Sequence, residues 1–196
     1  MSPLLPPFGD RRRIRVGLLG GSFNPAHGGH LHISREALKR LELNQVWWLV
    51  SPQNPLKPEK GMMPLAERMK GARALAKHPR IVVTDIETRL GTRYTVDTLA
   101  ALKKHFPRTH FVWLMGADNL RQLPRWRRWQ DIFKLVPIAI FPRPGYGRRG
   151  KAAAQFAARR RHGSRNFAKL KAPVWTVLDN PLNYESSTAI RKRKGL

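Results

Sequence analysis

Residues 20–31 read GGSFNPAHGGHL, a glycine-rich segment with two histidines, His27 and His30, three positions apart. It continues from IRVGLLG at 14–20, a short β-rich run that ends in glycine. It leads into a segment at about 29–41 in which Leu and Ala recur with helical spacing. The sequence therefore predicts a strand, a glycine-rich loop and a helix in direct succession.

The loop contains more than a tight turn requires. A turn between a strand and a helix can use Gly21 and Gly28 for unusual backbone angles and Pro25 for a fixed φ. It does not need His27 and His30, which lie where the helix begins. The exposed N–H groups of a first helical turn and the positive end of the helix dipole favour an anion there. We therefore interpret the two imidazoles as part of a phosphate site, whereas His32, just outside the HGGH unit, is interpreted as structural or surface-exposed.

Further β-rich runs alternate with helical segments along the chain. We expect strands at 46–51, 80–85, 110–116, 136–141 and 174–179, and helices at 64–77 and 95–102. This alternation implies right-handed βαβ crossovers. The predicted fold class is α/β: a Rossmann-like, mainly parallel sheet with helices on both faces.

Each unusual segment follows a predicted strand. Ligands of such sheets bind beyond the carboxyl ends of the strands. The segments that we expect to meet there are GGSFNPAHGGH, SPQNPLK, GADN and YESSTAIR.

The length of 196 residues and the 41% hydrophobic composition predict a single domain over 1–196. We expect a disordered or loosely ordered N-terminal tail at 1–13 and a basic excursion at about 143–171. No apolar run approaches the length of a membrane span, and the proline-rich start is unlike a signal peptide, so no membrane association and a cytoplasmic location are expected. The absence of cysteine excludes disulfides, zinc–cysteine sites and a thiol nucleophile.

The charge of +26 comes from 38 Lys and Arg residues against 12 Asp and Glu residues. Such a charge attracts anions and favours non-specific binding of polyphosphates and nucleic acids. Residues 143–171 hold ten Lys or Arg residues and no acid. A solvated basic segment explains them more simply than a specific RNA site does. A basic nucleic-acid-binding protein without turnover remains the alternative from another functional class.

Two familiar phosphate motifs are absent from the first loop, which has neither G-x-G-x-x-G nor Walker spacing. GYGRRGK at 145–151 matches G-x-x-x-x-G-K, but Ala152 replaces the Ser or Thr that binds Mg²⁺, so we interpret the match as a coincidence. His27 and His30 could instead bind a metal. No nearby acid or cysteine completes a ligand set, and no protein-bound metal is predicted.

The stretch GGSFNPAHGGHL resembles the GxFxPxHxGH signature of the nucleotidylyltransferase superfamily. A second segment, SSTAIRKR at 186–193, resembles the C-terminal ISSTxIR signature of the same superfamily. MGADNL at 115–120 and LPRWRRWQDIF at 123–133 are similar to the corresponding segments of bacterial nicotinate-nucleotide adenylyltransferases. The resemblance covers nearly the whole chain.

This resemblance implies transfer of AMP from ATP to nicotinate mononucleotide, giving deamido-NAD⁺ and pyrophosphate in NAD biosynthesis, with Mg²⁺ accompanying ATP. The implied catalytic residues are His27, His30 and Arg191. The implied ATP-binding residues are Gly20, Gly21, Ser22, Phe23, Gly29, Ser187 and Thr188. The implied nicotinate mononucleotide-binding residues are Thr95, Asp118, Trp126, Arg127 and Lys57.

Several of these residues have plainer explanations. Trp126 could be a core residue, although its place after LPR in a polar loop favours stacking on the pyridine ring. Asp118 could cap a helix instead of contacting a ribose. Lys57 is as consistent with simple exposure as with a phosphate contact. Glu185 stands where the family commonly has an apolar residue.

Other acceptors remain open. The same H-x-G-H chemistry serves nicotinamide mononucleotide, pantetheine phosphate and cytidylyl transfer in related families. The sequence leaves the oligomeric state open.

Overall fold

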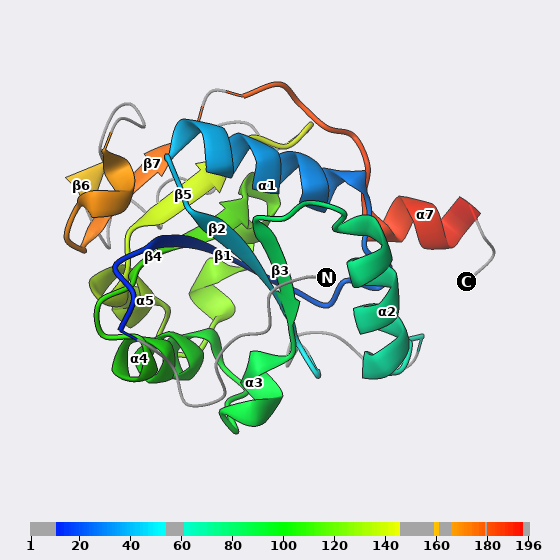
Figure 1. The fold of residues 1–196 in the computed structure, drawn as a ribbon. Coiled ribbons are helices and arrows are strands. Elements are labelled where there is room, and N and C mark those ends of the chain that lie inside the picture. The colour runs from blue at the N-terminus through cyan, green and yellow to red at the C-terminus, as the bar shows by residue number, and fades with distance from the viewer. Residues whose placement is uncertain (1–10, 54–60, 146–158, 161–165, 179, 194–196) are drawn as a thin grey trace.

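The computed structural model describes residues 11–53, 61–145, 159–160, 166–178 and 180–193. Within them one sheet has the strand order β3-β2-β1-β4-β5-β7-β6, and every neighbouring pair is parallel (Figure 1). Its strands are β1 (Arg15–Gly21), β2 (Gln45–Val50), β3 (Ile81–Thr84), β4 (His110–Gly116), β5 (Ile138–Phe141), β6 (Arg159–Arg160) and β7 (Val174–Val177).

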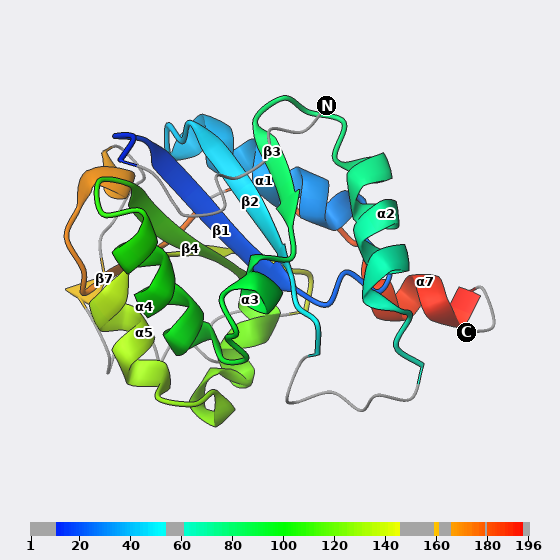
Figure 2. The same cartoon turned by 60° about the horizontal axis from the view of Figure 1, so that its bottom comes forward.

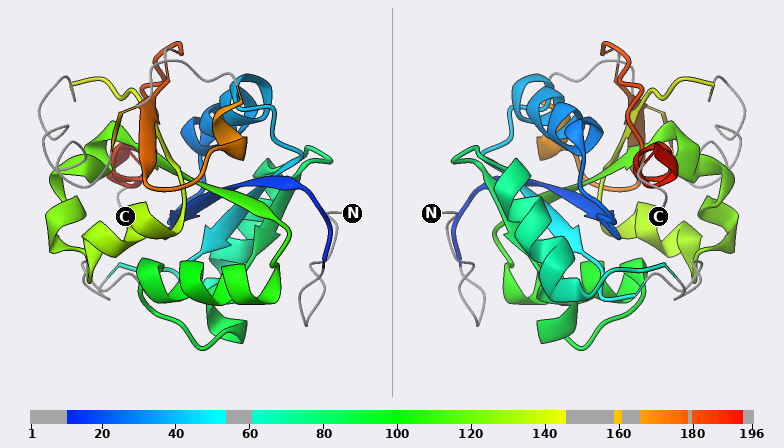
Figure 3. Two further views of the ribbon diagram at one scale, coloured as in Figure 1. Left: turned by 90° about the vertical axis from the view of Figure 1, so that its left-hand side faces the viewer. Right: turned by 90° about the vertical axis from the view of Figure 1, so that its right-hand side faces the viewer.

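Helices cover both faces of this sheet, as the two side views of Figure 3 show. One core lies between the sheet and α1, α2 and η3, and the other lies between the sheet and α3, α4 and α5. The helices are α1 (Gly28–Arg40), α2 (Leu65–Leu75), α3 (Ile86–Arg89), α4 (Thr95–His105), η1 (Ala117–Arg121), η2 (Leu123–Arg125), α5 (Trp129–Leu135), η3 (Phe167–Lys169) and α7 (Ser187–Arg193). The predicted Rossmann-like α/β class is confirmed.

The central strands are apolar on both sides because both sides are covered. In β2, Trp47 and Trp48 point to opposite faces, and each is fully buried in a different core. Each buried side chain of this size contributes roughly 2–3 kcal/mol through removal of its apolar surface from water. A charged substitution at either tryptophan would therefore disrupt one of the two layers.

The predicted strands are all present, with ends that differ by a few residues. The seventh strand, β6, was missed; it lies inside the basic excursion predicted at 143–171. The short helix α3 was also missed. The predicted tail at 1–13 falls mostly outside the described residues, which begin at 11. Among the helices in the described residues, none combines the length and apolar character needed to cross a membrane.

The carboxyl ends of the strands form one edge of the sheet. Figure 2 shows α7 beside this edge, close to the start of α1 and to α2. The segments that follow β1, β2, β3, β4 and β5 begin there as well. This edge therefore brings together loops that are far apart in the sequence, as the fold class predicts.

Candidate functional site

The loop between β1 and α1 is anchored by Phe23. Its φ of 49° is a left-handed backbone conformation, and its side chain is only 1% exposed. The Phe23 ring lies 4.5 Å from the His30 ring and 5.2 Å from the Trp48 ring, measured between centroids. The loop therefore uses its one aromatic residue to hold His30 against the core.

His27 and His30 form a reciprocal cap at the start of α1. The Nδ1 atom of His27 accepts from the main-chain N–H of Gly29 at 3.1 Å, and that of His30 accepts from the N–H of His27 at 3.2 Å. The ring centroids lie 3.9 Å apart. Because both Nδ1 atoms accept, each neutral ring carries its proton on Nε2. The pair therefore offers two Nε2–H groups as donors.

His27 is neutral at physiological pH. Its pKa is lowered from 6.5 to about 4, mainly by burial and also by nearby Arg143, while Glu185 opposes the shift. His27 therefore contributes a hydrogen-bond donor rather than a positive charge. Positive charge beside this ring comes from Arg143 instead.

The helix α7 binds the first loop directly. Ser187 donates its hydroxyl to the main-chain oxygen of Pro25 at 2.9 Å. Arg191 donates from Nη1 to the main-chain oxygen of Asn24 at 2.5 Å, and its Nη2 lies 3.5 Å from the hydroxyl of Thr188. The structure therefore brings the two motifs of the sequence together. Binding of phosphate oxygens by these side chains stays a prediction.

Two glycines of the predicted ATP site are required by close packing. A Cβ on Gly29 would lie 2.9 Å from the His27 ring and 3.1 Å from Nη1 of Arg143. A Cβ on Gly20 would lie 2.5 Å from Cη2 of Trp113. Side chains at these positions would displace the imidazole or the indole. Gly29 therefore makes room for the His27 ring, and Gly20 makes room for the Trp113 ring.

Arg143 lies in this site and was not among the predicted residues. It follows β5, and it donates from Nη1 to the main-chain oxygen of Glu185 at 3.0 Å. Its Nε lies 3.7 Å from Oδ1 of Asp118, too far for a hydrogen bond, and both atoms are buried. Its side chain is 16% exposed. Its place after a strand, in FPRPG, was the available signal, because this edge gathers such segments.

Glu185, the departure from the family pattern, faces the start of α1. A Cβ on Gly28 would collide with the Glu185 carboxylate. The first turn of α1 contains no acidic residue of its own. The carboxylate therefore brings a negative charge to the positive end of the helix dipole from outside the helix.

Arg68 was also missed, and it joins three segments at this edge. It is 2% exposed and donates from Nε to Met63 O at 2.8 Å and from Nη2 to Pro52 O at 2.9 Å. Its Nη1 donates to Ser22 O and to Ser51 O, each at 2.7 Å. Burial lowers the pKa of this guanidinium. The loop after β1, the loop after β2 and the approach to α2 are therefore fixed by one side chain.

Two of the predicted acceptor residues, Thr95 and Trp126, lie on the opposite side of the sheet from α1. Thr95 is the first residue of α4, and half-buried Trp126 follows η2. The Trp126 ring stands edge-on to the Trp113 ring, with centroids 6.4 Å apart and an interplanar angle of 85°. Trp126 packs at the border of the core, and its stacking role stays a prediction.

Arg127 connects the Trp126 loop to α4. Its Nη1 lies 3.6 Å from Oδ2 of Asp97, and its Cζ lies 4.8 Å from the centroid of the Tyr94 ring. Asp118 lies within η1, whose N-cap is Gly116, so it is not the cap of that helix. Lys57 lies outside the described residues.

Glu87 is a further buried carboxyl group at this edge. It is 7% exposed, and its Oε1 accepts from the Thr98 hydroxyl at 3.2 Å. Burial raises its pKa to about 7, although hydrogen bonds from Thr98 and Ser51 oppose the shift. Glu87 therefore links the end of β2 to α4.

His32 does not join the pair at the helix start. Its Nε2 lies 2.8 Å from the main-chain oxygen of Pro181, a contact that ties α1 to the segment before α7. This contact supports the structural interpretation of His32. Within the described ranges, no three His, Asp or Glu side chains gather as a metal cluster.

The chain is similar to known proteins over nearly its whole length. Residues 18–193 match the family described as cytidylyltransferase-like. The chain is 54% identical over 187 residues to a probable nicotinate-nucleotide adenylyltransferase of Parvibaculum lavamentivorans, covering 93% of each chain. It is 57% identical over 178 residues to a protein of the same name from Cereibacter sphaeroides, covering 90% of this chain and 96% of that one.

A solved structure has a similar fold. The nicotinic acid mononucleotide adenylyltransferase of Plasmodium falciparum, complexed with NaAD, superposes with a TM-score of 0.69 at 16% identity. The superposition covers 90% of this chain and 82% of that one. At this identity the likeness is one of fold.

Proposed function

The chain belongs to the cytidylyltransferase-like family and, within it, to the nicotinate-nucleotide adenylyltransferases; on this premise we propose that it transfers AMP from ATP to nicotinate mononucleotide. The products are deamido-NAD⁺ and pyrophosphate, and the reaction belongs to NAD biosynthesis. One observation carries the proposal: the HGGH helix start and the SSTAIR helix are hydrogen-bonded together at the carboxyl edge of a parallel sheet.

The reaction needs no protein nucleophile. A phosphate oxygen of the mononucleotide attacks the α-phosphorus of ATP, and a bond forms between them. The bond from the α-phosphorus to the oxygen that bridges to the β-phosphorus breaks, and that oxygen leaves with pyrophosphate. The protein has to align the attacking and leaving oxygens and offset the charge that spreads over them.

Two kinds of donor meet this need. His27 is neutral, and both His27 and His30 direct Nε2–H groups to the α- and β-phosphate region. Arg191 and Arg143 add positive charge, and an arginine presents several N–H groups to phosphate oxygens. Ser187 and Thr188 add hydroxyl groups where pyrophosphate departs.

We further propose that Mg²⁺ enters with ATP. When bound, the ion offsets the charge on the phosphates. Mg²⁺ generally keeps several waters and binds substrate phosphates with few carboxylates. The carboxylates at this edge are scattered rather than clustered, which fits such a metal. Asp118, whose Oδ1 lies 3.7 Å from Nε of Arg143, is one of them.

For the acceptor, Trp126 supplies a flat surface for the pyridine ring. Hydrogen-bond donors from the Thr95 hydroxyl and from main-chain N–H groups near Trp126 and Arg127 suit a carboxylate. The Arg127 side chain adds positive charge, although it already pairs with Asp97. This combination favours nicotinate over the neutral amide of nicotinamide mononucleotide.

The test is pyrophosphate release from ATP and Mg²⁺ with each mononucleotide as acceptor. We expect turnover with both and a preference for nicotinate of at least roughly a hundredfold in kcat/KM. Equal values, or a preference for the amide, would overturn the acceptor assignment and leave adenylyl transfer standing. Absence of turnover with any mononucleotide would overturn the proposed function as a whole.

A further inference from the structure

The acidic residues of the described chain cluster at the carboxyl edge of the sheet. Five of them lie in the first turns of α2, α3, α4, η1 and α5: Glu67, Glu87, Asp97, Asp118 and Asp131. Asp85 directly follows β3, and Glu185 precedes α7. Among the described acids, this leaves only Glu36 and Glu42 towards the opposite edge. Glu36 is paired with Arg40 at 2.5 Å.

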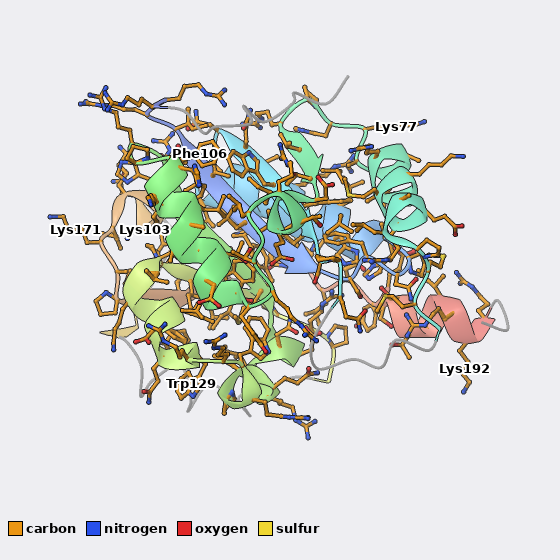
Figure 4. The ribbon with its side chains drawn as sticks, turned by 90° about the horizontal axis from the view of Figure 1, so that it is seen from below. Lys77, Lys103, Phe106, Trp129, Lys171 and Lys192 are labelled. Carbon is orange, nitrogen blue, oxygen red and sulfur yellow. The ribbon has the colours of Figure 1, made fainter. Side chains whose placement is uncertain are left out.

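The opposite edge, where the strands begin, carries mostly cations. The last turns of α1, α4 and α5 and the segments before the strands supply them: Arg11, Arg12, Arg13, Arg15, Lys39, Arg40, Lys77, Arg80, Lys103, Lys104, Arg108, Lys134, Lys169 and Lys171. In Figure 4, Lys77, Lys103 and Lys171 lie along the upper and left margins, while Trp129 and Lys192 lie along the lower margin. We call the set of cations that lie where the strands begin the amino edge.

Helix dipoles account for only part of the amino edge. Basic residues in a last helical turn complement the negative end of the dipole. Arg11, Arg13 and Arg108 are not in helices, yet all three are exposed at this edge. The edge is also remote from the predicted ATP site, because it lies at the other end of the strands. Attraction of the substrate therefore does not explain it.

We propose that the amino edge is a docking surface for the phosphodiester backbone of RNA. Its cations extend from Arg80 before β3 to Lys171 before β7, across five strand spacings. At about 4.8 Å for each spacing, this distance is about 24 Å. Double-stranded DNA carries one charge for every 1.7 Å or so of its axis, and a duplex of that charge density presents roughly 14 phosphates over this length on its two strands together. The surface is thus long enough to span several phosphates, and its charge is opposite to theirs.

A phosphodiester chain fits this surface better than a lipid surface does. Attachment to a membrane surface commonly adds exposed apolar side chains to the cations. The exposed large apolar residues of the described chain are Leu182 and Tyr184, and both lie in the segment before α7, away from the amino edge. The surface goes beyond the proposed transfer reaction and does not depend on it.

The test compares two variants that lose the same charge. The edge variant carries Arg11→Gln, Arg13→Gln, Lys104→Gln, Arg108→Gln and Lys171→Gln. All five side chains are exposed and make no hydrogen bond or ion pair to other described residues. The control variant carries Lys70→Gln, Arg121→Gln, Arg125→Gln, Lys192→Gln and Arg193→Gln, all exposed and away from this edge. Binding of a short fluorescein-labelled RNA is measured by anisotropy over a range of salt concentrations, without ATP. Anionic phospholipid vesicles serve as a second probe.

We expect the edge variant to bind the RNA at least roughly tenfold more weakly, with a salt dependence flatter by about one unit for each lost phosphate contact. The control variant should stay within about threefold of the wild type. Equal weakening of both variants would show that net charge rather than a surface binds RNA, and would overturn the proposal. Unchanged RNA binding by the edge variant would also overturn the proposal. The same holds if the wild-type protein binds the vesicles but not the RNA. The wild-type pyrophosphate assay, run separately, tests the proposed reaction and not this surface.

Discussion

Arg191 donates a hydrogen bond to the main-chain oxygen of Asn24, 2.5 Å away and 167 positions earlier in the chain. Ser187 binds the next peptide of the same loop through Pro25 O. The loop before α1 and the helix α7 are therefore one hydrogen-bonded unit. A substitution in either motif acts on both, and this coupling underlies the predictions for the phosphate site.

Replacing His30 by alanine should lower kcat by about a hundredfold or more, with little change in the KM of the acceptor. The imidazole should interact most strongly as charge develops on the phosphates, so its loss is felt in the transition state. Steady-state kinetics with varied ATP and acceptor measure the effect. His32→Ala is the matched control, because His32 binds Pro181 instead. A folded His30→Ala enzyme with near-normal kcat would remove His30 from the phosphate site.

Trp126→Ala should raise the KM of both mononucleotides while preserving much of the preference for nicotinate. The stacking surface is common to both pyridine rings, whereas the carboxylate is recognised by separate donors. The loss should be about tenfold, or roughly 1.4 kcal/mol. Measurements of kcat/KM for both acceptors in both proteins check this prediction. A variant that lost the preference but kept its affinity would show that Trp126 reads the carboxylate.

Arg68→Ala should lower the free energy of unfolding by about 3 kcal/mol or more, because four buried or partly buried carbonyl groups lose their donor. Arg68→Lys should recover little, since one ammonium group cannot reproduce the planar fork. Denaturant unfolding measures both. Arg73→Ala, an exposed change on the same helix, should stay within about 0.5 kcal/mol of the wild type. Wild-type stability in Arg68→Ala would contradict this role.

Glu185→Gln should lower the KM of ATP by about threefold. The carboxylate lies beside Gly28, where the start of α1 would meet a phosphate, and like charges repel. The effect should shrink at high salt because the group is exposed. ATP titrations at two ionic strengths provide the measurement, with the KM of the acceptor as the internal control. An increase in the KM of ATP would instead show that the carboxylate supports the site.

Glu87 predicts a pH dependence of stability with a definite sign. Its pKa rises from 4.5 to about 7 on folding, so the folded protein binds more protons than the unfolded chain between these values. The contribution of Glu87 to stability therefore falls as the pH rises through this window, by at most on the order of 3 kcal/mol. Glu87→Gln should remove this part of the pH dependence. If the free energy of unfolding changed equally with pH in wild type and Glu87→Gln across this window, the raised pKa of Glu87 would be contradicted.

The sequence was most informative where local pattern and local structure coincide. Apolar runs between glycines and prolines predicted the strands, and HGGH lies at a helix start as expected, because both signals act over a few neighbouring residues. The helix predicted at 95–102 begins at Thr95 as expected but continues to His105. Helix ends are harder to predict than the presence of a helix, because the terminal turns fray.

Residues whose role depends on distant partners were not predictable in this way. Arg68 has the spacing of an ordinary helical residue, yet its four carbonyl partners lie in three separate segments. Arg143 resembled one more cation of a basic stretch. Its contacts with Glu185 and Asp118 exist only because β4 and β5 end, and α7 begins, at the same place. The two-residue strand β6 is too short to produce a pattern.

The docking of α7 has a consequence for protein synthesis. During translation, β1, the loop after it and α1 leave the ribosome long before residues 187–193 do. Until then, Asn24 and Pro25 lack the two donors that α7 supplies. A nascent chain can therefore expose its histidine pair and still be unable to hold the loop as the finished protein does. The order in which the ribosome releases the two motifs delays completion of the site until α7 has emerged.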